Sequence, residues 1–136
     1  MNKLKKPRKK KRRGHYHRGV HVSPKCDHEC HYRSGWELSY LQYLDTDPTV
    51  KAYHYEKLKI PYVANVRSGR TRNYIPDVFI EYVDGSFALV EIKPKRKLTQ
   101  PTVVKKLKAA QAWVDALGVT LVIITEVELK LLGLLK

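Results

Sequence analysis

The chain has 136 residues and a formal net charge of +14, from 27 Lys and Arg against 13 Asp and Glu. This length suits one domain, and a hydrophobic content of 43% excludes a chain that is disordered throughout. No apolar run reaches the ~18 residues of a membrane span, and no apolar segment follows the charged N-terminus as in a signal peptide. We therefore expect a soluble intracellular protein with no membrane partner.

Positive charge is concentrated at the N-terminus, where residues 1–25 hold 11 Lys and Arg and no acid. A run such as KKPRKKKRR cannot bury enough apolar surface to fold. We therefore divide the chain into a basic arm, residues 1–25, disordered or extended, and a folded domain, residues 26–136. Nucleic acid is the commonest polyanion for such an arm. A solubilising tail and a nuclear-import signal are the alternatives.

The first folded elements are a helix and two strands. A helix is predicted over 35–45, because Ser34 is a good N-cap and Pro48 prevents its continuation. Candidate strands follow within residues 50–63. A basic turn, RSGRTR, occupies residues 67–72.

The middle of the chain predicts a β-hairpin, YIPDVFIEYVDGSFALVEIKPK, over residues 74–95. Its Asp84-Gly85 dipeptide predicts a two-residue type I′ turn, which needs positive φ at both central positions.

The rest of the chain predicts a helix over 101–117, a strand over 119–125 covered on both faces, and a short helix over 127–135. Pro101 suits the first helical turn and Gly118 suits the position after the last turn. Thr125 with Glu128 predicts a capping box for the final helix. This order of elements predicts a mixed sheet with helices packed on it, the last strand lying beside the hairpin.

Asp77, Glu91 and Lys93 lie along the hairpin beside its apolar residues, where burial is costly unless such groups are paired, bound to metal or used in chemistry. Glu91 and Lys93 point to the same face of their strand, and Asp77 begins the partner strand nearby. Leu89 shares their face while Val90 points to the other, so a simple solvated face is disfavoured. Carboxylates are hard ligands for Mg²⁺, and an ammonium group can orient an attacking water.

These residues carry a family resemblance. PD at 76–77 followed by EIK at 91–93 resembles the PD-(D/E)XK nuclease motif. The ordered set YRSGWELSYLQYLDTDPTV, IPY, RNYIPDVFIEYVDGS and LVEIKPKRKL is similar to the small TnsA-type endonucleases, which include TnsA N-terminal domains and head-completion nucleases of tailed phages. The resemblance covers about residues 30–126. It implies an α/β, restriction-endonuclease-like fold with a mixed β-sheet core flanked by helices.

The resemblance also implies roles for the hairpin residues. Asp77 and Glu91 would ligate Mg²⁺, with Mn²⁺ as a substitute, helped by the backbone carbonyl of Ile92. Lys93 would position the nucleophilic water.

Glu37 matches the upstream acid of the family, which completes the metal site or handles a proton. It could instead close a capping box with Ser34, three residues earlier. Its spacing from Leu41 and Leu44 places it near the apolar face of the helix. The two roles do not exclude each other.

Basic residues outside the hairpin are expected to contact double-stranded DNA. Lys105 and Lys108 lie with Gln111 along one side of the long helix, where a solvated face is the alternative. Phosphate contacts carry no sequence information, so we expect little sequence specificity. The expected DNA-contacting residues are Lys9, Lys10, Lys11, Arg12, Arg13, Arg67, Arg70, Arg72, Lys95, Arg96, Lys97, Lys105 and Lys108.

The resemblance implies an endonuclease that hydrolyses phosphodiester bonds at DNA packaging or head completion, in the host cytoplasm or in the virion. Phage head or portal proteins would be its partners. We expect the chain to lack the extra C-terminal domain of TnsA proteins, and this expectation favours the phage interpretation. The alternatives are a TnsA-like transposon endonuclease with transposition partners, an inactive DNA-binding head or neck protein, and a basic nucleic-acid-binding module. The sequence leaves open whether the chain forms a homodimer.

The segment CDHECH contains Cys26, His28, Cys30 and His31, which suggests a zinc site. Structural zinc sites usually join two ligand pairs that are distant in sequence, whereas these ligands would come from one short loop. The spacing therefore favours ordinary loop residues. A disulfide is disfavoured in an intracellular chain.

Overall fold

A computed structural model describes residues 18–136, in which no helix is long and apolar enough to cross a membrane. The predicted DNA contacts Lys9–Arg13 lie outside the described residues. The described elements are β1 (Gly19–His21), β2 (Cys30–Tyr32), α1 (Gly35–Thr46), β3 (Val50–Tyr55), β4 (Ile60–Asn65), β5 (Arg70–Tyr74), β6 (Val78–Tyr82), β7 (Phe87–Ile92), the 3₁₀ turn η1 (Lys95–Lys97), α2 (Pro101–Leu117), β8 (Thr120–Ile124) and α3 (Glu126–Leu131).

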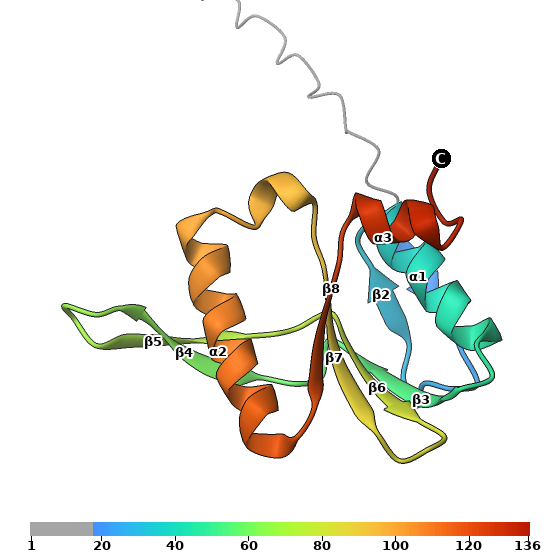
Figure 1. The fold of residues 1–136 in the computed structure, drawn as a ribbon, viewed down its shortest axis with the longest axis horizontal. Coiled ribbons are helices and arrows are strands. Elements are labelled where there is room, and N and C mark those ends of the chain that lie inside the picture. Colours follow the sequence, from blue (N-terminus) through green and yellow to red (C-terminus); the bar gives the residue numbers. More distant parts are fainter. Residues whose placement is uncertain (1–17) are drawn as a thin grey trace, which may run out of the picture.

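A four-stranded sheet with the order β3-β6-β7-β8 forms the centre of the molecule (Figure 1). β3, β6 and β7 pair antiparallel, whereas β8 returns through α2 to lie parallel to β7. Two-stranded ribbons are formed by β1 with β2 and by β4 with β5. The predicted mixed α/β sheet flanked by helices, with the last strand beside the hairpin, is confirmed.

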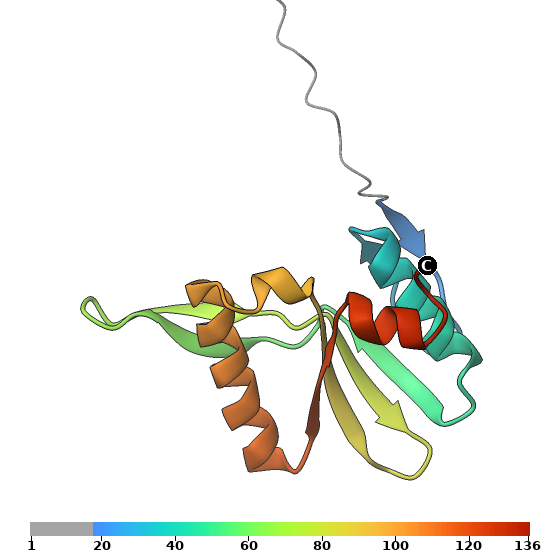
Figure 2. The ribbon, with the colours of Figure 1, turned by 45° about the horizontal axis from the view of Figure 1, so that its top comes forward.

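The central sheet separates two apolar cores. On one face Val90 packs with Leu41 of α1 and Leu129 of α3, all fully buried. On the other face Leu89 packs with Val114 of α2 and with the base of the β4–β5 ribbon. Figure 2 shows α1 and α3 together on one side of the sheet and α2 on the other. Truncating Leu89 to alanine removes buried contacts worth about 2–5 kcal/mol.

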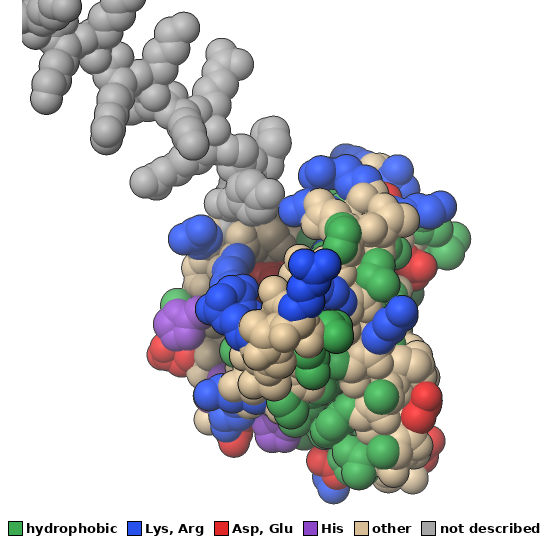
Figure 3. Space-filling view, turned by 90° about the vertical axis from the view of Figure 1, so that its left-hand side faces the viewer, with side chains coloured by type: hydrophobic (Ala, Val, Ile, Leu, Met, Phe, Trp, Pro, Cys, Tyr) green, Lys and Arg blue, Asp and Glu red, His purple; other side chains and the backbone are tan. Residues whose placement is uncertain are grey.

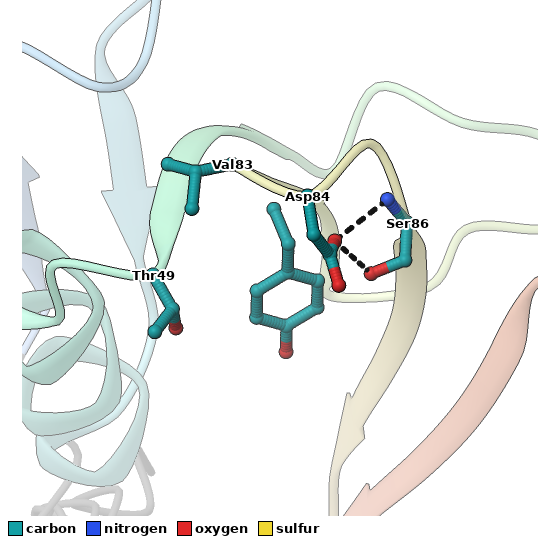
Figure 4. Close-up of a pocket in the computed structure, with 5 residues that line it drawn as sticks. Thr49, Val83, Asp84 and Ser86 are labelled. Carbon is teal, nitrogen blue, oxygen red and sulfur yellow. Dashed lines mark hydrogen bonds between the residues drawn. The ribbon is translucent and has the colours of Figure 1, made fainter.

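The β6–β7 turn differs from the predicted type I′ turn. The Tyr82 N–H donates to the Ser86 carbonyl at 2.9 Å, and this hydrogen-bonded pair encloses a loop of three residues, 83–85. The Gly85 N–H donates to the Tyr82 carbonyl at 3.0 Å, and Gly85 has a φ of 85°, but Asp84 has no positive φ. A turn followed by a left-handed glycine is the usual three-residue hairpin loop. The Asp84 carboxylate accepts from the N–H and hydroxyl of Ser86, which stabilises this loop (Figure 4).

The predicted basic turn at 67–72 is only partly a turn, because β5 begins at Arg70 and pairs with β4. Tyr74 therefore ends β5 instead of opening the next hairpin. Pro76, which has no N–H to donate to a ladder, separates the two strands.

The C-terminal elements are shorter and less covered than predicted. β8 lies at the edge of the sheet, so Leu121 is half-buried instead of fully covered. Thr125 and Glu128 form the predicted capping box. The helix ends well before residue 135, and Gly133 follows it with a φ of 73°.

Candidate active site

Strand register brings two acids together at one end of the central sheet. Val78 of β6 lies opposite Val90 of β7, so the next step of this antiparallel register places Asp77 opposite Glu91. Alternation along β7 puts Glu91 on the same face as Leu89, which is the face that α2 covers. A hairpin thus joins acids that are 14 residues apart in sequence.

Direct contacts orient these side chains. The Asp77 carboxylate accepts a 2.6 Å hydrogen bond from the Ile92 N–H. Lys93 Nζ lies 3.5 Å from Glu91 Oε1, and the Tyr74 hydroxyl donates to Glu91 Oε2. The three charged residues predicted from the hairpin, Asp77, Glu91 and Lys93, therefore line one pocket.

Glu37 of α1 reaches the same pocket from its first turn. Ser34 caps the helix by accepting from the Glu37 N–H at 3.2 Å. The Glu37 carboxylate does not complete the capping box. It accepts instead from the Arg33 N–H at 2.6 Å and from the Tyr55 hydroxyl at 3.1 Å. These bonds hold a buried carboxylate at the edge of the pocket, and its role in a metal site stays a prediction.

The acids of this pocket are electrostatically crowded. Burial raises the pKa of Asp77 well above its usual value, and the negative charge of Glu91 raises it further. Burial also raises the pKa of Glu91, against the opposing effects of Tyr74 and Lys93. Such a group of carboxylates is stabilised by protons or by a bound cation.

Known proteins match the chain over most of this region. The family model described as "TnsA-like endonuclease N terminal" matches residues 47–126, which is more than half of the chain. The chain belongs to this family. It is also similar to the head completion nuclease of Enterobacteria phage T4, at 32% identity over 125 residues that cover 75% of this chain and 82% of that protein. The resemblance found in the sequence is confirmed, and the family match includes Asp77, Glu91 and Lys93 but begins after Glu37.

Glu56 also lines the acidic pocket, although the sequence did not point to it. It follows β3 with a φ of 50°, the one described non-glycine residue with a positive φ. Its N–H donates to the Asp77 carbonyl at 3.0 Å, and burial raises the pKa of its side chain. Carboxylate oxygens of Glu37, Glu56 and Asp77 lie within 4.8 Å of one another. Strained backbone of this kind is concentrated at functional sites.

The long helix α2 contributes to the pocket a lysine that the sequence did not single out. Lys106 lines the pocket, while Lys108 is exposed and Lys105 Nζ donates to the Ala64 carbonyl at 3.0 Å. Each residue turns a helix by ~100°. Lys105 and Lys108, which are three residues apart, therefore lie on a side of the helix that does not face the acids, whereas Lys106 faces them.

The donor set fits a hard divalent cation. Glu37, Glu56 and Asp77 offer carboxylate oxygens, the ligand type that Mg²⁺ prefers. Glu91, predicted as a ligand, has Lys93 near one oxygen and Tyr74 bonded to the other. A bound cation would offset the repulsion between these clustered carboxylates.

The predicted DNA-contacting residues among those described lie outside the acidic pocket. Arg67, Arg70 and Arg72 are exposed on the β4–β5 ribbon, which projects past α2 (Figure 1). Lys95–Lys97 form the turn η1 directly after the site. In Figure 3, which views the molecule from the ribbon side, Lys and Arg side chains spread over the face and acids lie mostly at its margins.

Proposed function

We propose that this member of the TnsA-like endonuclease family is a Mg²⁺-dependent DNA endonuclease with little sequence specificity. One observation carries the proposal: Asp77, Glu91 and Lys93, with Glu37, meet in one pocket at the end of the hairpin. A pocket that holds several buried acids and a lysine is unfavourable for stability, so a chemical use is the simplest reason to keep it.

The pocket residues have separate tasks in this proposal. Asp77 and Glu37 hold Mg²⁺ or its substitute Mn²⁺, together with Glu91 or the backbone carbonyl of Ile92. When bound, the cation offsets charge on the scissile phosphate and lowers the pKa of a water ligand. Glu56 adds a further carboxylate on the side of Glu37.

Lys93 orients the attacking water and stabilises the added charge on the phosphate in the transition state. The Tyr74 hydroxyl, by bonding one oxygen of Glu91, leaves the other oxygen facing Lys93. Tyr74 therefore acts as a positioning residue for the pair.

Phosphate contacts by the exposed arginines of the β4–β5 ribbon can be tested by salt dependence. Combined replacement of Arg67, Arg70 and Arg72 with alanine is expected to lower the slope of log K against log salt by about one unit per lost contact, because fewer counterions are released. Binding to a labelled duplex would be measured by fluorescence anisotropy at several salt concentrations. Lys130→Ala, on the exposed surface of α3, is the matched control. An unchanged slope would remove the ribbon from the DNA interface.

Cleavage of supercoiled plasmid tests the proposed activity. Nicked and linear products are expected with Mg²⁺ or Mn²⁺ and none with EDTA. Sequencing the ends cut from a random DNA library tests specificity, and one preferred site would contradict the proposed lack of it. Cutting in EDTA would contradict the metal dependence.

For the biological role, we propose DNA processing at phage head completion or packaging, in the host cytoplasm or in the virion. The similarity to the head completion nuclease of phage T4, which extends over 82% of that protein, supports this role. Partners would then be phage head or portal proteins, or a second copy of the chain. The family match equally supports transposon end cleavage with transposition proteins, and absence of cutting would favour an inactive DNA-binding head protein.

A further inference from the structure

We propose that the protein has a second metal site, for Zn²⁺ or a similar transition metal, formed by Cys26, Asp27, His28 and His54. The first three residues lie in the segment before β2, and His54 lies in β3. The site is separate from the acidic pocket and does not depend on its proposed activity.

The distances within the segment suit a small coordination sphere. Cys26 Sγ lies 3.4 Å from His28 Nδ1, which in turn lies 2.8 Å from Asp27 Oδ1. One donor atom from each of the three residues lies within 4.8 Å of the others. Thiolate and imidazole are the ligands that Zn²⁺ prefers, in contrast to the all-oxygen donors of the active site.

The hydrogen bond of His28 to a backbone carbonyl orients its ring so that Nδ1 faces Asp27 and Cys26. His28 Nε2 lies 2.8 Å from the Tyr55 carbonyl, which can only accept, so Nε2 carries a proton and donates it to this carbonyl. His28 Nδ1, on the other side of the ring, lies 2.8 Å from Asp27 Oδ1 and 3.4 Å from Cys26 Sγ, and this is the side on which a metal would bind. Metal-binding histidines commonly donate their other N–H to a backbone carbonyl in this way.

His54 supplies an independent observation. Its Nδ1 atom is buried and, among the described residues, has no hydrogen-bond partner, yet it lies 3.7 Å from Asp27 Oδ1. His54 approaches the three-residue group from β3, on the side of Asp27. As a fourth ligand it would answer the objection from the sequence that all ligands come from one short loop.

The ligand set differs from the one that the sequence suggested. His31 is exposed and lies beside Glu29 at 3.5 Å, so it is not a ligand. Cys30 is buried in the core with its Sγ 3.7 Å from that of Cys26. Lys57 Nζ lies 3.1 Å from Asp27 Oδ1 and competes with a metal for this carboxylate, which makes Asp27 the weakest member of the set.

A metal here would connect the N-terminal segment to the end of β3. Tyr55, whose carbonyl accepts from His28, also donates its hydroxyl to Glu37 and immediately precedes Glu56. The site is therefore structural: it fixes the β3 end from which the acidic pocket is built.

Cobalt substitution tests the site in the full reduced chain. Co²⁺ bound to a thiolate gives a charge-transfer band in the near ultraviolet, and the chain has only two cysteines. We expect a band that saturates at one Co²⁺ per chain and disappears on addition of Zn²⁺. Cys26→Ala is expected to abolish the band, and His54→Ala to weaken Co²⁺ binding by about 10–100-fold. His31→Ala, in the same segment, should behave as wild type.

Several results would overturn the site: no band in the reduced wild type, a band that survives Cys26→Ala, or Co²⁺ affinity unchanged in His54→Ala. A disulfide between Cys26 and Cys30 in protein purified with its metal retained would also overturn it. Circular dichroism of each metal-free variant shows whether the chain is folded. Because His54 is partly exposed, His54→Ala keeps the test valid if Cys26→Ala fails to fold.

Discussion

Replacing Lys93 with methionine is expected to lower the rate of plasmid cleavage by at least about 10²-fold while Mg²⁺ binding persists. Methionine keeps an unbranched side chain of similar length but removes the ammonium group that faces Glu91 at 3.5 Å. The proposed role of Lys93 is to stabilise charge that develops only in the transition state, so the rate of chemistry falls and ground-state binding does not. Initial rates would be measured at saturating DNA, and Mg²⁺ binding by calorimetry.

Lys51→Met is the matched control, because Lys51 is exposed on β3 and lies outside every site proposed for this chain. Its cleavage rate should equal that of the wild type. If Lys93→Met loses Mg²⁺ or DNA binding in proportion to its rate, Lys93 serves binding and not catalysis.

Replacing Asp77 with asparagine is expected to abolish cleavage and to raise the thermal stability of the metal-free protein. Burial and Glu91 raise the pKa of Asp77, so the folded state binds its proton more tightly than the unfolded state. The stability that this proton contributes is complete at acidic pH and is lost as pH rises through the raised pKa. Asparagine removes the charge and can still accept from the Ile92 N–H.

The melting temperature of Asp77→Asn relative to wild type, measured in EDTA, should therefore increase as the pH rises from the usual range of a carboxyl pKa towards neutral pH. A gain of 1 kcal/mol corresponds to about 4 °C for a domain of this size. Mg²⁺ should raise the melting temperature of the wild type and leave that of the variant nearly unchanged.

Asp84→Asn is the control for this charge removal. Bonds from Ser86 lower the pKa of the exposed Asp84, so its contribution to stability is present at neutral pH and lost as pH falls. It should gain no stability at neutral pH. A lower melting temperature of Asp77→Asn at neutral pH, or a preserved response to Mg²⁺, would contradict the assignment.

Local signals predicted most of the fold that positions the site. The cap at Ser34 and the pair Pro101 and Gly118 act within one helix, and the structure places both helices where these residues predict. Side chains alternate between the two faces of any strand, because this period is set by the backbone. Leu89 and Val90 are buried on opposite faces, so Glu91, two residues after Leu89, lies on a covered face.

The parts that were missed depend on packing between distant segments. Glu56 joins the acids only through the pairing of β3 with β6 and through a backbone with positive φ, neither of which a residue pattern in its own segment reveals. Lys106 faces the pocket because of how α2 is rotated on the sheet. The loop at Asp84 has three residues because the strands pair at Tyr82 and Ser86, although the dipeptide itself suits two.

The most direct test of the central claim compares plasmid cleavage by the wild type, Asp77→Asn and Lys93→Met in one assay, with DNA binding measured in parallel. We expect Mg²⁺-dependent cutting by the wild type, no detectable cutting by either variant, and DNA binding retained by all three. DNA binding without cutting by the wild type, or cutting that survives both substitutions, would show that the hairpin charges are not an active site.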